Sequence, residues 1–353
     1  RYEVKRRIFT SITIGYNGNG TSRGPCRPGG DRRSFRYRAS LITLDTYLAR
    51  YFNVPAQGFS QLLTLTGFEN DVWNAARDGI IAATVPMPFF FALALIVKRG
   101  KFLNGIRRVL SETKVNLSLL LVDQLFTLPI LIILSVALAD VVARYQLSIV
   151  SSAFWNKLPV AVVAIAGVIL GDFVAYWRHR FEHSRLIWPS HSIHHSDTAL
   201  TWMTIFRFHP INRFTTVMID GAFLLLWGLP PYALVINALV RQYYGAFIHA
   251  DLPWMFGPLR YVVVIPAAHR WHHAKDYRGS GANFASVFSF FDLIFGTFYV
   301  PGSCDMELGI SEPIGTGIFS QIAHPLKPSA YPPARTDGLQ PSSASRQILA
   351  GHK

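Results

Sequence analysis

The sequence has few charged residues and only two cysteines, and both shortages exclude large classes of protein. Charged side chains make up 15% of the 353 residues, whereas soluble domains average about 25%. Cys26 and Cys304 cannot form a disulfide framework, and neither belongs to a CxxC pair. The sequence also lacks a GxGxxG dinucleotide motif and the HExxH motif of many zinc hydrolases. We therefore expect any electrons that the protein uses to come from another molecule.

The sequence contains long uncharged runs, which predict membrane-spanning helices. Such runs, with few polar interruptions, occupy residues 79–97, 117–143 and 158–177. At a rise of 1.5 Å per residue, each nearly spans or exceeds a hydrocarbon core of about 30 Å. The basic residues from Lys98 to Lys114 follow the first run and predict a cytoplasmic loop. Buried helices of a large soluble protein are the alternative.

The apolar stretch 215–248 is interrupted by the sequence Gly228-Leu229-Pro230-Pro231. Adjacent prolines remove two backbone donors and end a helix. This pattern predicts a helical hairpin that dips into the bilayer and returns to the side from which it came. The segments on either side of the hairpin should therefore meet on the cytoplasmic face.

The net charge of +14 raises the question of nucleic-acid binding. Ten basic residues lie in the first 38 positions, against only Glu3 and Asp31, and others follow the ends of apolar runs. Basic residues at the ends of apolar runs set membrane topology, whereas a nucleic-acid surface would intersperse them with polar recognition groups. We expect a membrane protein that does not bind nucleic acid.

Histidine is concentrated in one part of the chain, and its spacing is that of metal ligands on helices. Ten of the twelve histidines fall between His179 and His273, and eight of them form the clusters HRFEH (179–183), HSIHH (191–195) and HRWHH (269–273). Residues three and four apart share one face of a helix, so each cluster should present its imidazoles to a common point. Eight imidazoles exceed the four ligands of one tetrahedral zinc and favour two metals.

These motifs together resemble the fatty acid hydroxylase/sterol desaturase superfamily of integral-membrane di-iron enzymes. The resemblance covers residues 165–302. It rests on the order HxxxH, HxxHH, HxxHH, on Arg207-Phe208-His209-Pro210, on His249 after the hairpin, and on Asn283-Phe284 followed by Asp292 and Phe295-Gly296-Thr297. Relatives carry a tyrosine and a glycine where this chain has Phe284 and Ala285.

The resemblance implies two irons that activate O2 to hydroxylate or desaturate a lipid from the bilayer, with electrons from a separate NAD(P)H-linked carrier protein. The implied metal ligands are His179, His183, His191, His194, His195, His249, His269, His272 and His273. His209 is a tenth candidate, and a helix cap is its alternative role. Asp172, Asn283 and Asp292 are the candidate catalytic residues.

The positions of the charged residues near the histidines and within the apolar stretches predict their roles. Asp172 lies seven residues before His179, on the same helical face, and is expected to orient an imidazole. Glu182 and Asp276 are expected to form solvated salt bridges. Asp123 and Asp220 lie within apolar stretches, where no partner is evident from the sequence. Arg178, Arg180 and Arg270 are expected to bind lipid headgroups or to face water.

The predicted fold is all-α: a membrane helical bundle, multi-pass, whose histidine-rich helical cap lies on the cytosolic face. The expected divisions are a basic, disordered tail over 1–40, N-terminal membrane helices over 41–164, the catalytic domain over 165–302, and a largely disordered tail over 303–353. An ether-lipid monooxygenase and a sterol C-methyl oxidase are the alternatives within the superfamily. A membrane metal transporter and a zinc hydrolase are alternatives from other classes.

Overall fold

The computed structural model describes residues 77, 81, 84–98, 106–275 and 281–331. Within these ranges the secondary structure is helical, and β-pairing is limited to one bridge between Ala274 and Leu308. This agrees with the predicted all-α class. The predicted tail at 1–40, Asp276 and residues 332–353 lie outside the described residues, as do residues 99–105 of the predicted basic loop. Residues 106–114 of that loop are helical instead.

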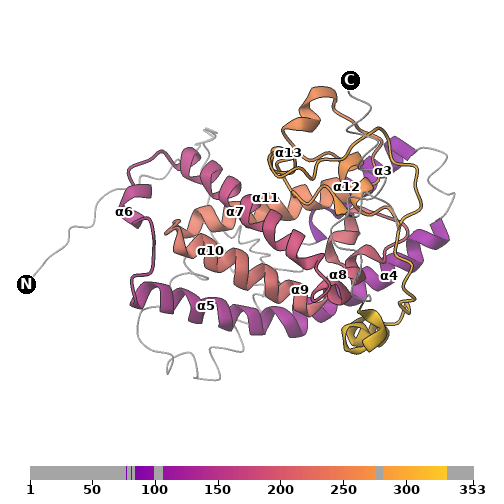
Figure 1. Cartoon of the computed structure of the whole chain (residues 1–353), viewed down its shortest axis with the longest axis horizontal. Helices are drawn as coiled ribbons and strands as arrows, with labels where there is room; N and C mark the ends of the chain where they lie inside the picture. The colour runs from indigo at the N-terminus through magenta and orange to yellow at the C-terminus, as the bar shows by residue number, and fades with distance from the viewer. Residues whose placement is uncertain (1–76, 78–80, 82–83, 99–105, 276–280, 332–353) are drawn as a thin grey trace, which may run out of the picture. The chain divides into compact units, whose positions relative to one another are not determined.

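Two described helices are long and apolar enough to cross a membrane, and they coincide with two of the predicted runs (Figure 1). The first is continuous over Val109–Arg144 and is made of α4 (Ile106–Val122), the π-helical turn η2 (Asp123–Thr127) and α5 (Leu128–Arg144). The second is α7 (Val160–Glu182). The remaining predicted run, residues 79–97, forms the shorter helix α3 (Met87–Lys98), which begins between Pro86 and Pro88.

The predicted hairpin is present and packs against α7. The π-turn η4 (Thr216–Asp220) and α10 (Gly221–Leu226) form its first arm, and α11 (Pro231–His249) forms its second. Gly228 has a φ of +63°, and a Cβ there would lie 2.0 Å from the carbonyl oxygen of Val150, so the turn requires glycine. The absence of a Cβ at Gly171 similarly lets Asn237 of α11 approach α7 closely.

Shorter helices precede and follow α7 and α11 along the chain. They are α6 (Ser152–Trp155), α8 (Trp188–His195), η3 (Trp202–Phe206), α9 (Pro210–Thr215), η5 (Gly257–Tyr261), α12 (Pro266–His272) and α13 (Phe290–Ile294). Prolines stand in the first turn of α8, α9 and α12, where a missing amide donor costs nothing.

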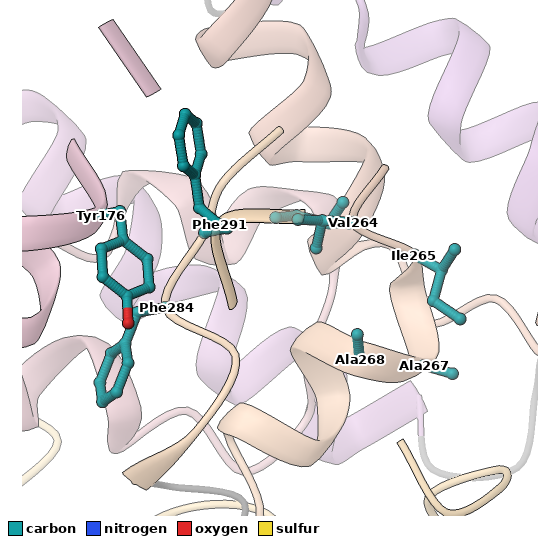
Figure 2. Packing of buried hydrophobic residues seen from close by; sticks show 9 residues of the cluster. Tyr176, Val264, Ile265, Ala267, Ala268, Phe284 and Phe291 are labelled. Atoms are coloured by element: carbon teal, nitrogen blue, oxygen red, sulfur yellow. The ribbon is translucent and has the colours of Figure 1, made fainter. Parts of the chain in front are cut away.

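A buried apolar cluster fixes α12 relative to α7 (Figure 2). Tyr176 of α7 packs edge-on against Phe284, with ring centroids 6.1 Å apart, and its hydroxyl lies 2.9 Å from Thr297 Oγ1. Ile265 and Ala268, at the start of α12, belong to the same cluster and are almost completely buried. The segments bearing the first and third histidine clusters are therefore held together by apolar packing.

The region from residue 303 onward, expected to be a tail, is packed against the helices as far as residue 331. Its helices are α14 (Ile318–Ala323), η7 (His324–Leu326) and η8 (Pro328–Ala330). Ile314, Ile318 and Ile322, at helical spacing, pack against Val115, Leu119 and Ile193. These three isoleucines, spaced four residues apart, are the signal for packing that a compositional boundary misses.

Candidate metal centre

Nine histidines converge into two buried groups. The first, called here the five-histidine group, contains His179, His183, His191, His195 and His272, and the second, the four-histidine group, contains His194, His249, His269 and His273. Within each group the candidate ligand nitrogens all lie within 4.8 Å of one another. The groups are neighbours, because the rings of His195 and His273 stack with centroids 4.5 Å apart.

The second and third sequence clusters are divided between the two groups, which corrects the expectation that each cluster serves one point. Histidines four apart stay together: His191 with His195, and His269 with His273. The remaining histidine of each cluster, His194 or His272, joins the other group. Helical geometry explains the division, because positions i+3 and i+4 differ by about 100° around the axis.

Ring-nitrogen contacts in the five-histidine group fit a bound cation. His179 Nδ1 lies 2.8 Å from the carbonyl oxygen of Phe284, and His272 Nδ1 lies 2.7 Å from that of Ala282. A carbonyl only accepts, so both Nδ1 atoms carry hydrogen and both Nε2 atoms are lone-pair donors in the neutral rings. Those Nε2 atoms are 3.0 Å apart. Two facing lone pairs repel, and a cation bound by both removes the conflict.

Protonation does not resolve this conflict at neutral pH. Burial lowers the pKa of His272 to about 4 and also lowers those of His194 and His273 below their usual value. The rings are therefore neutral at pH 7, the form that binds transition metals.

The four-histidine group shows the same signature with weaker support from its surroundings. His249 Nδ1 lies 2.6 Å from the carbonyl oxygen of Gly245, so its Nε2 is again a lone-pair donor. That Nε2 lies 3.1 Å from His194 Nε2 and 2.9 Å from His269 Nε2. Within the described part of the chain, the Nδ1 atoms of His194, His269 and His273 are buried without a hydrogen-bond partner.

One loop, residues 282–288 and called here the carbonyl loop, supplies the acceptors for His179 and His272. Asn283 lies between the two accepting residues and has a φ of +56°, a left-handed conformation that asparagine tolerates. Its side-chain amide donates to the carbonyls of Ala268 and Tyr299, and its Oδ1 accepts from the Tyr299 amide. Asn283 therefore fixes the turn that aims both carbonyls at histidines.

Asp172 and Asp292 hold the same loop and contact no histidine. The carboxylate of Asp172 accepts from the backbone amides of residues 286, 287 and 288 at 2.7–3.1 Å. Asp292 accepts from the amides of Phe284 and Ala285, and burial raises the pKa of Asp292 to about 6. The expectation that Asp172 orients an imidazole directly is wrong, because amides of the loop occupy its oxygens.

Glu182 is buried beside a histidine, contrary to the expected solvated salt bridge. Its side chain has no exposed surface, and Oε2 lies 2.8 Å from Arg178 Nη1 and 3.5 Å from His191 Nδ1. Arg178 is also buried and therefore faces neither water nor lipid headgroups. The i,i+4 spacing of this pair is typical of a helix surface, so the sequence offered no signal for its burial.

The two aspartates that lie within apolar stretches have arginine partners on elements distant in sequence. Asp123 pairs with Arg213 at 2.9 Å, and Asp220 pairs with Arg178 and with Arg241 of α11. Arg270 likewise pairs with Asp251. These contacts depend on the tertiary fold, which is why no partner was visible in the sequence.

His209 is not brought into either group. Its Nδ1 accepts from the amide of Ile211, at the start of α9, and its Nε2 lies 3.1 Å from the carbonyl oxygen of Ile322. Both ring nitrogens are thus occupied, and the ring caps a helix. This geometry matches the alternative role considered for His209.

Known proteins share the segment that bears these groups. Residues 164–297 match the family model for fatty acid hydroxylases. An ornithine lipid hydroxylase from Rhizobium tropici is 31% identical over 49% of this chain and 54% of its own length. These matches support the fatty acid hydroxylase/sterol desaturase superfamily for the segment 164–297. No solved structure matches it.

Other members of the superfamily widen the range of similar proteins. An alkylglycerol monooxygenase from Danio rerio is 26% identical over 74% of this chain and 57% of its own length. A Δ7-sterol 5(6)-desaturase from Gibberella zeae is 28% identical over 38% of this chain and 37% of its own length. The chain therefore spans about half the length of the first two relatives and about a third of the last.

Proposed function

We propose that this protein is an integral-membrane, multi-pass lipid oxygenase that uses two irons and O2. The observation that carries the proposal is the convergence of nine histidines, eight of them buried, into two neighbouring groups with facing lone pairs. Iron bound there would supply the activation of O2 for oxidation of an unactivated C–H bond. The named activities of the relatives, hydroxylase, monooxygenase and desaturase, all fit this class of reaction.

The protein's own residues would position the irons and exclude water from them. The Phe284 ring contacts His179, His183 and His272 at centroid separations of 5.1–5.6 Å. Phe208 stacks on His194 at 4.7 Å. Aromatic walls of this kind support a dry site, which strengthens electrostatic interactions and protects reactive species from water.

The substrate we propose is a lipid whose chain enters from the bilayer. An apolar groove of about 340 Å³ is lined by Met87, Pro88, Phe91, Leu117, Trp202 and Met203. That volume lies within the range of small-molecule sites. Its wall η3 packs against α11, which ends at His249 of the four-histidine group. The sequence predicts a substrate slot lined by residues of 117–143, 158–177 and the hairpin at 215–248. Of these segments only 117–143 contributes to the groove, through Leu117.

Reducing equivalents would come from a separate NAD(P)H-linked electron carrier, and the histidine groups would lie on the cytoplasmic face. Support for the topology comes from the position of the histidines, because His179 and His183 lie at the end of the candidate span α7 and His249 ends the hairpin arm α11. An ether-lipid or sterol substrate suits the same proposal, because relatives are named for both.

Metal analysis of the purified full-length protein tests the proposal. We expect about two irons per chain in wild type, and loss of metal in His194→Ala and His272→Ala, each of which removes a ligand from a different group. His209→Ala is the matched control, since it removes a buried histidine that belongs to neither group. One zinc per chain, or no stoichiometric metal, would exclude a di-iron oxygenase and favour hydrolysis or transport.

A further inference from the structure

A buried chain of alternating charges ends at one of the two histidine groups. Glu182 is followed outward by Arg178, Asp220 and Arg241, with contacts of 2.8, 2.9 and 2.6 Å between successive members. The side chains of the first three members are at most 6% exposed, and that of Arg241 is 16% exposed. The two positive and two negative charges cancel.

Such a chain needs an explanation beyond stability. Moving a charge out of water costs several kcal/mol, and buried ion pairs often contribute no more stability than apolar residues of the same volume. Glu182 Oε1 also accepts from Thr215 Oγ1, so both carboxylate oxygens are occupied and the group is fixed in place. What the fixed carboxylate contacts is His191.

His191 is oriented so that one nitrogen faces the metal group and the other faces Glu182. Its Nε2 lies 3.2 Å from His195 Nε2 inside the five-histidine group, and its Nδ1 lies 3.5 Å from Glu182 Oε2. A histidine that ligates through Nε2 carries its hydrogen on Nδ1, and that hydrogen needs an acceptor.

Asn212 is the other group beside His191 Nδ1, at 3.3 Å, and its own Oδ1 lacks a hydrogen-bond partner within the described residues. The Oδ1 and Nδ2 atoms of an asparagine side chain are hard to distinguish by shape. Exchanging them makes Asn212 a second acceptor for the hydrogen on His191 Nδ1. A carboxylate binds an N–H donor more strongly than a neutral amide does. Glu182 is therefore the dominant partner.

The other histidines of the two groups lack such a partner among the described residues. In the part of the chain that the structure describes, His191 is the one ligand candidate of the nine whose ring contacts a carboxylate. The Nδ1 atoms of His179, His249 and His272 face neutral backbone carbonyls. The anionic partner thus distinguishes the five-histidine group from the four-histidine group.

We propose that Glu182, held by Arg178, is a positioning residue for His191 and makes the two metal sites inequivalent. The carboxylate orients the imidazole and increases its electron donation, so the metal of the five-histidine group is bound more tightly and is harder to reduce than it would be without Glu182. This inference rests on the proposed function, because it assumes a metal in each group.

The test compares iron retention in full-length variants during dialysis against a chelator. Glu182→Gln keeps the shape and removes the charge, and we expect about 10–100-fold weaker binding of one of the two irons. Mössbauer spectra of the ⁵⁷Fe-loaded variant should show a change in the signal of one iron only. Asp123→Asn is the matched control, because it breaks another buried carboxylate–arginine pair that contacts no histidine.

The double variant Arg178→Gln/Glu182→Gln separates positioning from charge balance. Glu182→Gln alone leaves the four-residue charge network with one excess positive charge. In the double variant only Asp220 and Arg241 keep their charges, so the network is neutral again. We expect the double variant to regain thermal stability and still to lose one iron. Full iron retention in both variants, or its recovery in the double variant, would overturn the inference. Wild type without two irons would instead overturn the proposed function.

Discussion

The two histidine groups have similar ligands but different surroundings. In the five-histidine group, two rings are backed by the carbonyl loop and a third by Glu182. In the four-histidine group, one ring is backed by a carbonyl of its own helix, and the other three Nδ1 atoms have no partner among the described residues. Partners outside the ligand set decide how firmly an imidazole is held, so equal ligand chemistry does not make equal sites.

The largest change in the difference between the two groups should come from a substitution in the carbonyl loop. Asn283→Leu removes three hydrogen bonds of Asn283 and places an unfavourable side chain at a φ of +56°. We expect a loss of roughly 2–4 kcal/mol in the free energy of unfolding and selective loss of the iron in the five-histidine group. Calorimetry and iron analysis measure both.

Asn283→Gly is the control for this variant. Glycine accepts the left-handed conformation but makes none of the hydrogen bonds, so it separates backbone strain from loop anchoring. If the leucine variant lost iron equally from both groups, the distinction drawn between their surroundings would fail.

Protonation at low pH should destabilise both groups alike, so the difference between the two groups should not extend to acid sensitivity. Burial lowers the pKa of His272 to about 4, against about 6.5 in an unfolded chain. Between these values the unfolded chain binds more protons, so stability is complete above pH 6.5 and is lost as the pH falls toward 4. At pH 5 His272 alone should cost about 2 kcal/mol.

The melting temperature of the metal-free protein at pH 7.5, 6 and 5 measures this loss. His272→Gln and His273→Gln, one from each group, should each reduce the dependence on pH, because burial lowers the pKa of both histidines. If only one of the two variants reduced the pH dependence of the melting temperature, the prediction would be wrong and the two groups would also differ in protonation.

The smallest effect on the metals should come from the apolar groove. Trp202→Ala enlarges the groove beside η3, which packs against the helix that ends at His249. We expect unchanged iron content and a KM for a long-chain lipid raised about tenfold by lost apolar contact. Iron loss in this variant would mean that η3 supports the four-histidine group instead of a substrate.

Sequence patterns predicted the ligand candidates well and their partition poorly. The HxxxH and HxxHH spacings identified eight of the nine converging histidines, and His249 came from the resemblance. Helical angles already separate His194 from His195 by about 100°, so the division into two groups was available from the spacing. The roles of Asp172 and Asn283 were not, because Asp172 binds a loop 114–116 residues away and Asn283 acts through tertiary contacts with Ala268 and Tyr299.

Buried charge was the other feature that the sequence concealed. Arg178 and Glu182 have the spacing of an ordinary surface pair, and only the packing of η4 and α11 over them removes water. Asp123 and Asp220 looked isolated for the same reason, since their partners come from elements 90 and 21–42 residues away. Long-range pairs of this kind have no local signature.

The distribution of ligands along the chain has a consequence for biosynthesis. Four of the five histidines in the five-histidine group lie at or before residue 195, whereas three of the four in the other group lie at or after residue 249. Chains emerge from the ribosome N-terminus first. We therefore expect four ligands of the five-histidine group to be synthesised when the four-histidine group has only His194. The order of synthesis thus favours metal binding to the five-histidine group first.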